Sequence, residues 1–239
     1  MGAGTIEDPT YVRDAFARIA DRYVTTNHVL SLGTDILWRR KVARMVRRWQ
    51  PQRLLDVATG TGDLALEIQD ICPATEIVGS DFCAEMLQHA ADRGLEKTVV
   101  ADAMDLPFKD GEFDVITVAF GLRNMVDYAG ALREMRRVLS PGGHLLVLDF
   151  SVPQGVLKKP YQWYLHRVLP MLAGWLTREP DAYEYLGGSI EEFPMGEEMA
   201  GLIEQSGFHD VEVMPVTFGV ASIYTGQVQS RGESRVGVE

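Results

Sequence analysis

The chain has 239 residues, enough for one sizeable hydrophobic core with a small embellishment. Its formal net charge of -11 argues against a general nucleic-acid binder, because phosphate contacts need a basic face. Two cysteines are too few for a disulfide framework or a thiolate site, and the five histidines lack His-x-x-x-His spacing, so we expect no metal.

The first 50 residues predict a helical cap. Apolar residues recur at helical spacing from Pro9 to Trp49, with a break at Gly33. The segment does not open like a secretory signal, and no apolar run reaches about 18 residues, so we expect a cytoplasmic protein. A basic run in the cap is interpreted as the solvated face of a helix, with an anionic membrane surface or partner as the alternative. Its members are Arg39, Arg40, Lys41, Arg44, Arg47 and Arg48.

Residues 51–226 predict an α/β core in which apolar strands alternate with amphipathic helices. Such strands indicate a parallel sheet covered on both faces. The letters SPGG are expected to turn the chain into the fifth strand. The expected strands are 53–58, 76–80, 98–101, 113–120 and 144–150, and the expected helices are 63–71, 84–93 and 127–139.

The last third of the chain has a different pattern. Residues 155–195 are rich in aromatic side chains and predict a helical insertion, followed by a helix over 195–206. Two closely spaced strands, 211–216 and 220–225, predict an antiparallel hairpin at the sheet edge. The polar residues 227–239 are expected to form a disordered tail.

The stretch LLDVATGTGDLA contains a strand, a glycine loop and the start of a helix. Gly60 and Gly62 allow close approach of backbone to a ligand, with free N–H groups at the helix start. The letters GTGDLA also match the dinucleotide pattern G-x-G-x-x-A, with Asp81 19 residues beyond Gly62. This motif alone does not distinguish an NAD enzyme from an S-adenosylmethionine methyltransferase. It could also be a tight turn that binds no ligand.

Three carboxylates favour the methyltransferase interpretation. Asp56 lies before the glycines, where it suits a cationic amino-acid tail, and Asp102 follows the third strand, where it can accept from an adenine amine. Asp81 is expected on the ribose hydroxyls, and Thr61 and Ala103 would complete the pocket. All three acids end successive strands at the edge where open α/β sheets bind ligands. The chain also lacks a Tyr-x-x-x-Lys pair, which would favour a short-chain dehydrogenase.

Four stretches carry a family resemblance over nearly the whole chain. They are DVATGTGDLA, VVADAMDLPFKDGEFDVITVAFGLRN, LREMRRVLSPGGHLLVLDFS and YEYLGGSIEEFP. Together they resemble the ubiquinone/menaquinone biosynthesis C-methyltransferase family, for which FGLRN and the last stretch are the most specific. The resemblance implies cofactor contacts at Thr61, Asp81 and the Asp102–Ala103 pair. The chain departs from the family at Ala119, where some members have serine, and in its amino-terminal segment, which lacks an Asp after the Tyr.

The resemblance implies a Rossmann-like class I S-adenosylmethionine-dependent methyltransferase. Its fold would be a mostly parallel seven-stranded sheet with an antiparallel edge strand and an amino-terminal helical cap. Its reaction would methylate a prenylated quinol ring, demethylmenaquinol or polyprenyl-methoxy-benzoquinol or both, and leave S-adenosylhomocysteine. Another small aromatic or lipid acceptor, an NAD-dependent oxidoreductase and a cofactor-binding module without catalysis stay open as alternatives.

Arg123 and Asn124 follow the expected strand 113–120, which is interpreted as fully buried, and we expect them to be catalytic. Arg123 would stabilise the developing phenolate as a fixed cation, and Asn124 would donate to a quinol oxygen. The alternative is that Arg123 pairs with a buried acid and Asn124 caps a turn. Asp149, at the end of the fifth strand, has no assigned role at this stage.

Substrate access is expected to involve the 155–195 insertion on the substrate side. Its stretch Trp163–Leu176 is too short to span a bilayer but suits an isoprenoid tunnel or an interfacial helix. The alternatives are a helix that covers the sheet and a homodimer contact. The expected partner is a lipid quinol, with transient contact at the inner face of the membrane and no nucleic acid. Further pocket candidates, for which ordinary packing is the alternative, are Tyr23, His166, Tyr183 and Tyr185.

Overall fold

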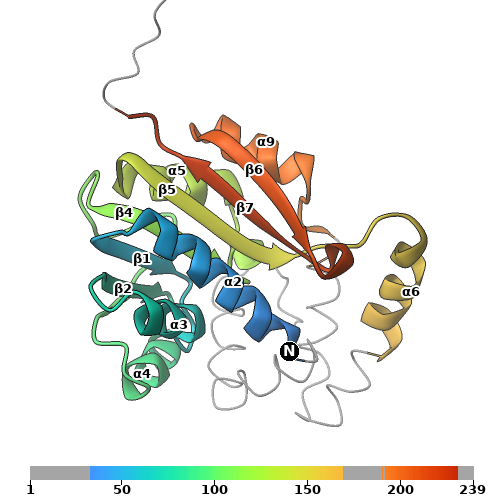
Figure 1. The fold of residues 1–239 in the computed structure, drawn as a ribbon, viewed down its shortest axis with the longest axis horizontal. Helices are drawn as coiled ribbons and strands as arrows, with labels where there is room; N and C mark the ends of the chain where they lie inside the picture. Colours follow the sequence, from blue (N-terminus) through green and yellow to red (C-terminus); the bar gives the residue numbers. More distant parts are fainter. Residues whose placement is uncertain (1–32, 169–189, 191, 231–239) are drawn as a thin grey trace, which may run out of the picture.

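The computed structural model describes residues 33–168, 190 and 192–230 (Figure 1). Its first part contains α2 (Thr34–Trp49), β1 (Arg53–Val57), α3 (Asp63–Ile71), β2 (Glu76–Asp81), α4 (Ala84–Asp92), β3 (Thr98–Val100), β4 (Phe113–Ala119) and the 3₁₀ turn η1 (Leu122–Asn124). Its second part contains α5 (Tyr128–Val138), β5 (Leu139–Phe150), η2 (Gly155–Leu157), α6 (Lys158–Trp163), the π-helical turn η3 (Tyr164–Val168), α9 (Glu197–Gln205), β6 (His209–Val216), η4 (Thr217–Gly219) and β7 (Ala221–Gln227).

The described strands form one seven-stranded sheet in the order β3-β2-β1-β4-β5-β7-β6. Strands β1 to β5 pair in parallel, so their carboxyl ends meet at one edge of the sheet. β7 pairs antiparallel with both β5 and β6, which confirms the predicted hairpin at the end of the sheet. The predicted fold class, a Rossmann-like, mostly parallel sheet, is therefore confirmed.

Helices cover both faces of this sheet. On one face, α2 and α3 pack on strand residues such as Leu54, Val115 and Leu146, and on the other α5 and α9 pack on neighbours such as Leu55 and Ile116. In Figure 1, α2 and α3 lie in front of the sheet, and α5 and α9 lie behind it. Successive strand residues point to opposite faces, which explains why the residues on both faces of these strands are mostly apolar. Each fully buried Leu or Ile stabilises the fold by about 1.5–3 kcal/mol.

The SPGG stretch differs from its prediction. The structure assigns Leu139–Phe150 to one strand, with Leu139 opposite Phe113 and His144 opposite Val115. The residues of β5 between Leu139 and His144 outnumber those of β4 between Phe113 and Val115, so the pairing shifts register there. Gly142, in this stretch, has a φ of 83°. The expected turn is thus absorbed as a bulge inside β5.

The described part of the predicted cap, α2, packs directly on the sheet. The ordered core extends slightly beyond its predicted end at residue 226. Gln227 belongs to β7, and the buried Val228 donates its N–H to the Gly143 carbonyl oxygen. The division into a 1–50 cap, a 51–226 core with a 155–195 insertion and a tail otherwise stays a prediction. Among the described helices, none has the length and hydropathy needed to cross a bilayer.

Candidate active site

The glycine loop joins β1 to α3 at the carboxyl edge of the sheet. Gly60 and Gly62 have φ values of 56° and 81°, in the region that side chains rarely adopt. The Gly60 N–H donates to Asp81 Oδ2 at 2.9 Å, which ties the loop to the end of β2. A Cβ at Gly62 would lie 3.1 Å from the Cβ of Ala90, so this glycine also allows α3 to start close to α4.

Backbone strain is concentrated at the same edge. Ala58, after β1, and Phe120, after β4, have φ values of 52° and 60° although neither is glycine. Gly121 follows directly, and a Cβ there would lie 2.5 Å from that of Ala58. The ends of β1 and β4 are therefore held in strained, closely packed turns. Such strain persists where surrounding structure enforces it, and it is common at binding sites.

Two adjoining cavities open along this edge. The first encloses about 630 Å³ of empty space and the second about 700 Å³, in each case including space open to solvent. The residues common to both linings are Ala58, Asp81, Phe82, Gly121 and Asn124. The first is also lined by Arg39, Asp56, Thr59, Gly60, Thr61, Asp63, Leu64, Met86, Ala119 and Phe120. The second is also lined by Val57, Ala101, Asp102, Ala103, Met104, Met125 and Val126.

Asp56 is a buried carboxylate in the wall of the first cavity. Its oxygens accept from the hydroxyls of Thr59 at 2.6 Å and Thr117 at 2.5 Å. Burial raises the pKa of Asp56 to about 6, against the opposing effects of these hydrogen bonds and of the Arg39 charge. The site therefore has an ionisable acid whose charged form a ligand cation would stabilise.

Asp81 stands between the two cavities. Besides the Gly60 N–H, its carboxylate accepts from the Cys83 N–H at 2.9 Å, so each oxygen accepts at least one backbone N–H. Each oxygen keeps lone pairs for a second donor, which fits the two hydroxyls of a ribose. Burial raises the pKa of Asp81, and the backbone N–H groups oppose the rise.

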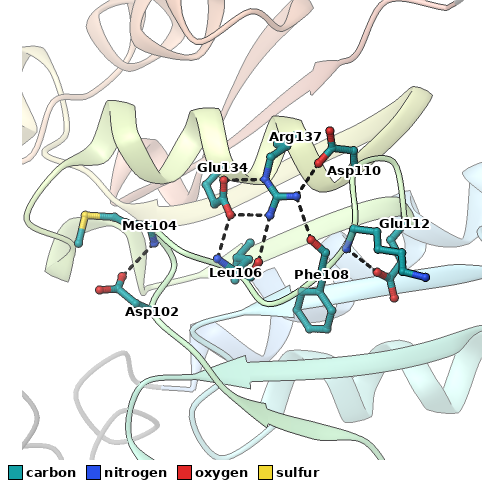
Figure 2. Close-up of polar contacts among 9 residues, drawn as sticks. Asp102, Met104, Leu106, Phe108, Asp110, Glu112, Glu134 and Arg137 are labelled. Carbon is teal, nitrogen blue, oxygen red and sulfur yellow. Dashed lines mark hydrogen bonds and ion pairs between the residues drawn. The ribbon is translucent and has the colours of Figure 1, made fainter.

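Asp102 and Ala103 lie in the second cavity, on the loop between β3 and β4. Asp102 Oδ1 accepts from the Met104 N–H at 2.9 Å. The rest of this loop is held by Arg137 of α5, which donates to the carbonyl oxygens of Leu106 and Phe108 at 3.0 and 2.9 Å (Figure 2). Arg137 also pairs with Glu134 and Asp110, as the figure shows. α5 thus fixes the loop that carries the predicted adenine contact.

Arg123 is buried rather than exposed to the cavities. Its Nη1 donates to Asp149 Oδ1 at 2.7 Å and to the Phe120 carbonyl oxygen at 2.6 Å. Its guanidinium also lies over the ring of Phe150, with 5.2 Å between its carbon and the ring centroid. Asp149 itself is fully buried, and burial raises its pKa against the opposing charge of Arg123. The contacts of Arg123 therefore agree with the alternative that it pairs with a buried acid. Arg123 is not among the residues that line the two cavities.

Asn124, in contrast, borders both cavities. Its Nδ2 contacts the Phe120 carbonyl oxygen at 3.4 Å, the same atom that accepts from Arg123. His166 is exposed on η3 and is not among the residues that line the two cavities. Tyr23, Tyr183 and Tyr185 lie outside the described residues.

The predicted place of Arg39 on a solvated helix face is wrong. Arg39 is 7% exposed and lines the first cavity. The other members of the basic run that the structure describes are exposed. Its spacing from Trp38, Val42 and Val46, all buried, places Arg39 on the packed face of α2, and this signal was available in the sequence.

Comparison with known proteins decides the family. A model of the ubiE/COQ5 methyltransferase family matches residues 5–228. The chain belongs to the ubiE/COQ5 methyltransferase family. A demethylmenaquinone methyltransferase from Thermus thermophilus is 46% identical over 217 residues, which cover 88% of this chain and 98% of that relative. A ubiquinone/menaquinone biosynthesis C-methyltransferase UbiE from Geobacter sulfurreducens is 44% identical, over 90% of this chain and 88% of its own length.

Solved structures agree with the fold. A SAM-dependent methyltransferase from Thermotoga maritima superposes with a TM-score of 0.64 at 20% identity, over 89% of this chain and 97% of its own. The family membership confirms the expectation of an S-adenosylmethionine-dependent methyltransferase. The oxidoreductase and the inactive module are thereby set aside.

The two cavities of this ubiE/COQ5-family chain fit S-adenosylmethionine by the chemistry of their walls. The shared Asp81 carboxylate suits ribose hydroxyls, and the acidic first cavity suits an ammonium group at Asp56. The second cavity combines apolar Met104, Met125 and Val126 with Asp102, as an adenine ring with an exocyclic amine requires. Among the described residues, no group of three His, Cys, Asp or Glu is arranged to hold a metal ion.

Proposed function

We propose that the chain transfers a methyl group from S-adenosylmethionine to a ring carbon of a prenylated quinol, demethylmenaquinol or polyprenyl-methoxy-benzoquinol or both. The names of its relatives from Thermus thermophilus and Geobacter sulfurreducens support this acceptor class. The observation that carries the proposal is the position of Asn124, which borders both cavities at the strained end of β4.

In this proposal the chain acts mainly by binding and orientation. When bound, S-adenosylmethionine supplies a methyl group on a sulfonium. Asp56, Asp81 and Asp102 hold the amino-acid tail, the ribose and the adenine, respectively. Asn124 donates to a quinol oxygen and so aims the ortho carbon of the ring. That carbon gains the methyl group as S-adenosylhomocysteine leaves, and it passes its proton to water, so the oxidation state of the quinol does not change.

Arg123 contributes electrostatically from behind the same turn. Because the Phe120 carbonyl oxygen accepts from both Arg123 and Asn124, the cation is linked to the amide that faces the acceptor. A fixed positive charge at this depth stabilises a developing phenolate without having to reorganise. Burial raises the pKa of Tyr161, and the Arg123 charge opposes the rise, which indicates that this tyrosine of α6 lies near the same cation.

We further propose that α6 and the turn before it contact a membrane surface, where such a quinol resides. Val156 and Trp163 are 90% and 64% exposed, among the largest exposed fractions of the described large apolar side chains. Lys158 and Lys159 are exposed between them. Apolar side chains beside lysines suit the interface of an anionic bilayer.

The test of the proposed reaction is mass spectrometry of quinones from cells that lack this protein. We expect a prenylated quinone lighter by one CH2 to accumulate, and its ring identifies the acceptor. Re-expression of the wild-type chain should restore the mature quinone, whereas Asn124→Ala should restore it poorly. An unchanged quinone pool in the deletion strain would contradict the proposal.

A further inference from the structure

Arg39 has a setting that its solvated neighbours on α2 do not share. Its side chain is buried against the first cavity, and its guanidinium carbon lies 5.3 Å from the centroid of the Phe120 ring. Nη1 donates to the buried Asp35 carboxylate one helical turn earlier, and Nη2 lies 3.9 Å from Asp63 Oδ2. A cation is thus fixed at the cavity wall by partners on two elements.

The charges around the first cavity are strongly unbalanced. Its described lining contains three carboxylates, Asp56, Asp63 and Asp81, and Arg39 is the single basic side chain among them. Asp63 is already paired with Arg93, at 2.7 Å, outside the cavity lining. A ligand with an ammonium group alone would match the carboxylates of this cavity but not the guanidinium of Arg39, whereas a zwitterionic amino acid presents a group of opposite charge to each. The amino end of α3, which begins at Asp63, adds further partial positive charge.

We propose that the Arg39 guanidinium binds the carboxylate of the cofactor's amino-acid tail, opposite the Asp56 carboxylate that binds its ammonium. The proposal rests on the cofactor placement given above and is independent of the methyl acceptor. Asp35 acts as the positioning residue, because its hydrogen bond to one Nη leaves the other N–H groups of the planar fork for the ligand. Arg39 also neutralises part of the acidic wall when the cavity holds no ligand.

The proposal can be tested by calorimetric binding of two ligands that differ in one group. S-adenosylhomocysteine has the whole amino-acid tail, and its decarboxylated analogue keeps the ammonium but lacks the carboxylate. Arg39→Gln should weaken binding of S-adenosylhomocysteine by about 30-fold and leave the analogue within about threefold of wild type. Arg40→Gln, which removes the same charge from the exposed face of α2, should change neither affinity.

The loss of Arg39 leaves the Asp35 carboxylate buried, so folding needs a separate control. The double variant Asp35→Asn/Arg39→Gln removes both charges, and thermal unfolding establishes that it folds. It should show the same selective loss for S-adenosylhomocysteine. Equal weakening of both ligands would mean a purely structural role and would overturn the proposal, as would unchanged binding of both.

Failure of the cofactor placement itself gives a different pattern. Asp56→Asn and Asp81→Asn should weaken both ligands, since both keep the ammonium and the ribose. If neither variant affects either ligand, the placement is wrong. If both variants weaken both ligands while Arg39→Gln shows no selectivity, the placement stands and only the role of Arg39 is wrong.

Discussion

The Asp56 carboxyl links cofactor binding to pH. In the free protein burial raises its pKa to about 6, and an ammonium group beside it would favour the charged form and lower that pKa. Binding should therefore release a proton near pH 6, and the affinity should fall as the pH decreases through this value. The affinity falls toward low pH because the pKa of Asp56 is raised in the free protein and would be lowered in the complex.

We predict that S-adenosylhomocysteine binds roughly tenfold more weakly at pH 5 than at pH 7. Calorimetry in buffers of different ionisation enthalpy would measure both the affinity and the protons released. Asp56→Asn, as the control, should bind weakly with little change between the two pH values. A wild-type affinity that is constant over this range would contradict the assigned role of Asp56.

The Arg123–Asp149 pair complicates the simplest mutational test of the mechanism. Arg123→Ala should lower the free energy of unfolding by about 3–5 kcal/mol, because it leaves Asp149 buried without its cation. Arg123→Met/Asp149→Asn removes both charges and should regain most of that stability in urea unfolding. With folding restored, we expect turnover to stay about 100-fold or more below wild type. Near-wild-type turnover in the stable double variant would show that the cation is structural alone.

Among the elements, the contact between the ends of β1 and β4 is the most constrained part of the site. Gly121→Ala would place a Cβ 2.5 Å from that of Ala58 and force the two turns apart. We expect a loss of about 1–3 kcal/mol in stability and about tenfold in S-adenosylhomocysteine affinity, measured by unfolding and calorimetry. Gly201→Ala in α9, where the nearest atom would be 3.9 Å away, should instead stabilise by about 0.5–1 kcal/mol and leave binding unchanged. If Gly121→Ala binds S-adenosylhomocysteine as wild type does, the site does not depend on the close contact between the turns after β1 and β4.

The exposed apolar side chains of η2 and α6 give a prediction for membrane contact. Trp163→Asp should reduce co-flotation of the protein with anionic liposomes at least about tenfold, because it replaces apolar contact by repulsion. Val100→Asp, at an exposed position on the distant edge strand β3, is the matched control and should float like wild type. Equal flotation of all three proteins, or none by wild type, would count against the proposed contact.

The sequence predicted the elements better than their irregularities. Periodicity of apolar residues located the strands and helices of the core within a few residues, because the pattern directly reflects which faces are buried. The apolar pattern did not predict the bulge of SPGG inside β5, since a Pro-Gly-Gly stretch is compatible with both a turn and a bulge. The sequence also predicted a solvated position for Arg39, because Arg39 belongs to a basic run. Its helical spacing from Trp38, Val42 and Val46 instead indicates the packed face of α2.

At the scale of the whole molecule, the parallel topology explains how much of the site could be predicted. Asp56 and Asp81 lie at the ends of β1 and β2, and Asp102 follows β3, so the parallel order of these strands brings all three to one edge. The burial of Arg123 depends on Asp149, which lies 26 residues later in the chain, and on Phe150, both at the end of β5. Such pairing is tertiary, and no local pattern around FGLRN distinguishes a cation that faces a ligand from one that faces a buried acid.

A crystal structure of the complex with S-adenosylhomocysteine would test the central claim most directly, since two adjoining cavities allow two orientations of the ligand. We predict the ribose on Asp81, the adenine beside Asp102 in the second cavity, and the amino-acid tail between Asp56 and Arg39 in the first. A ligand bound with its tail toward Asp102, or bound away from Asp81 altogether, would contradict the account.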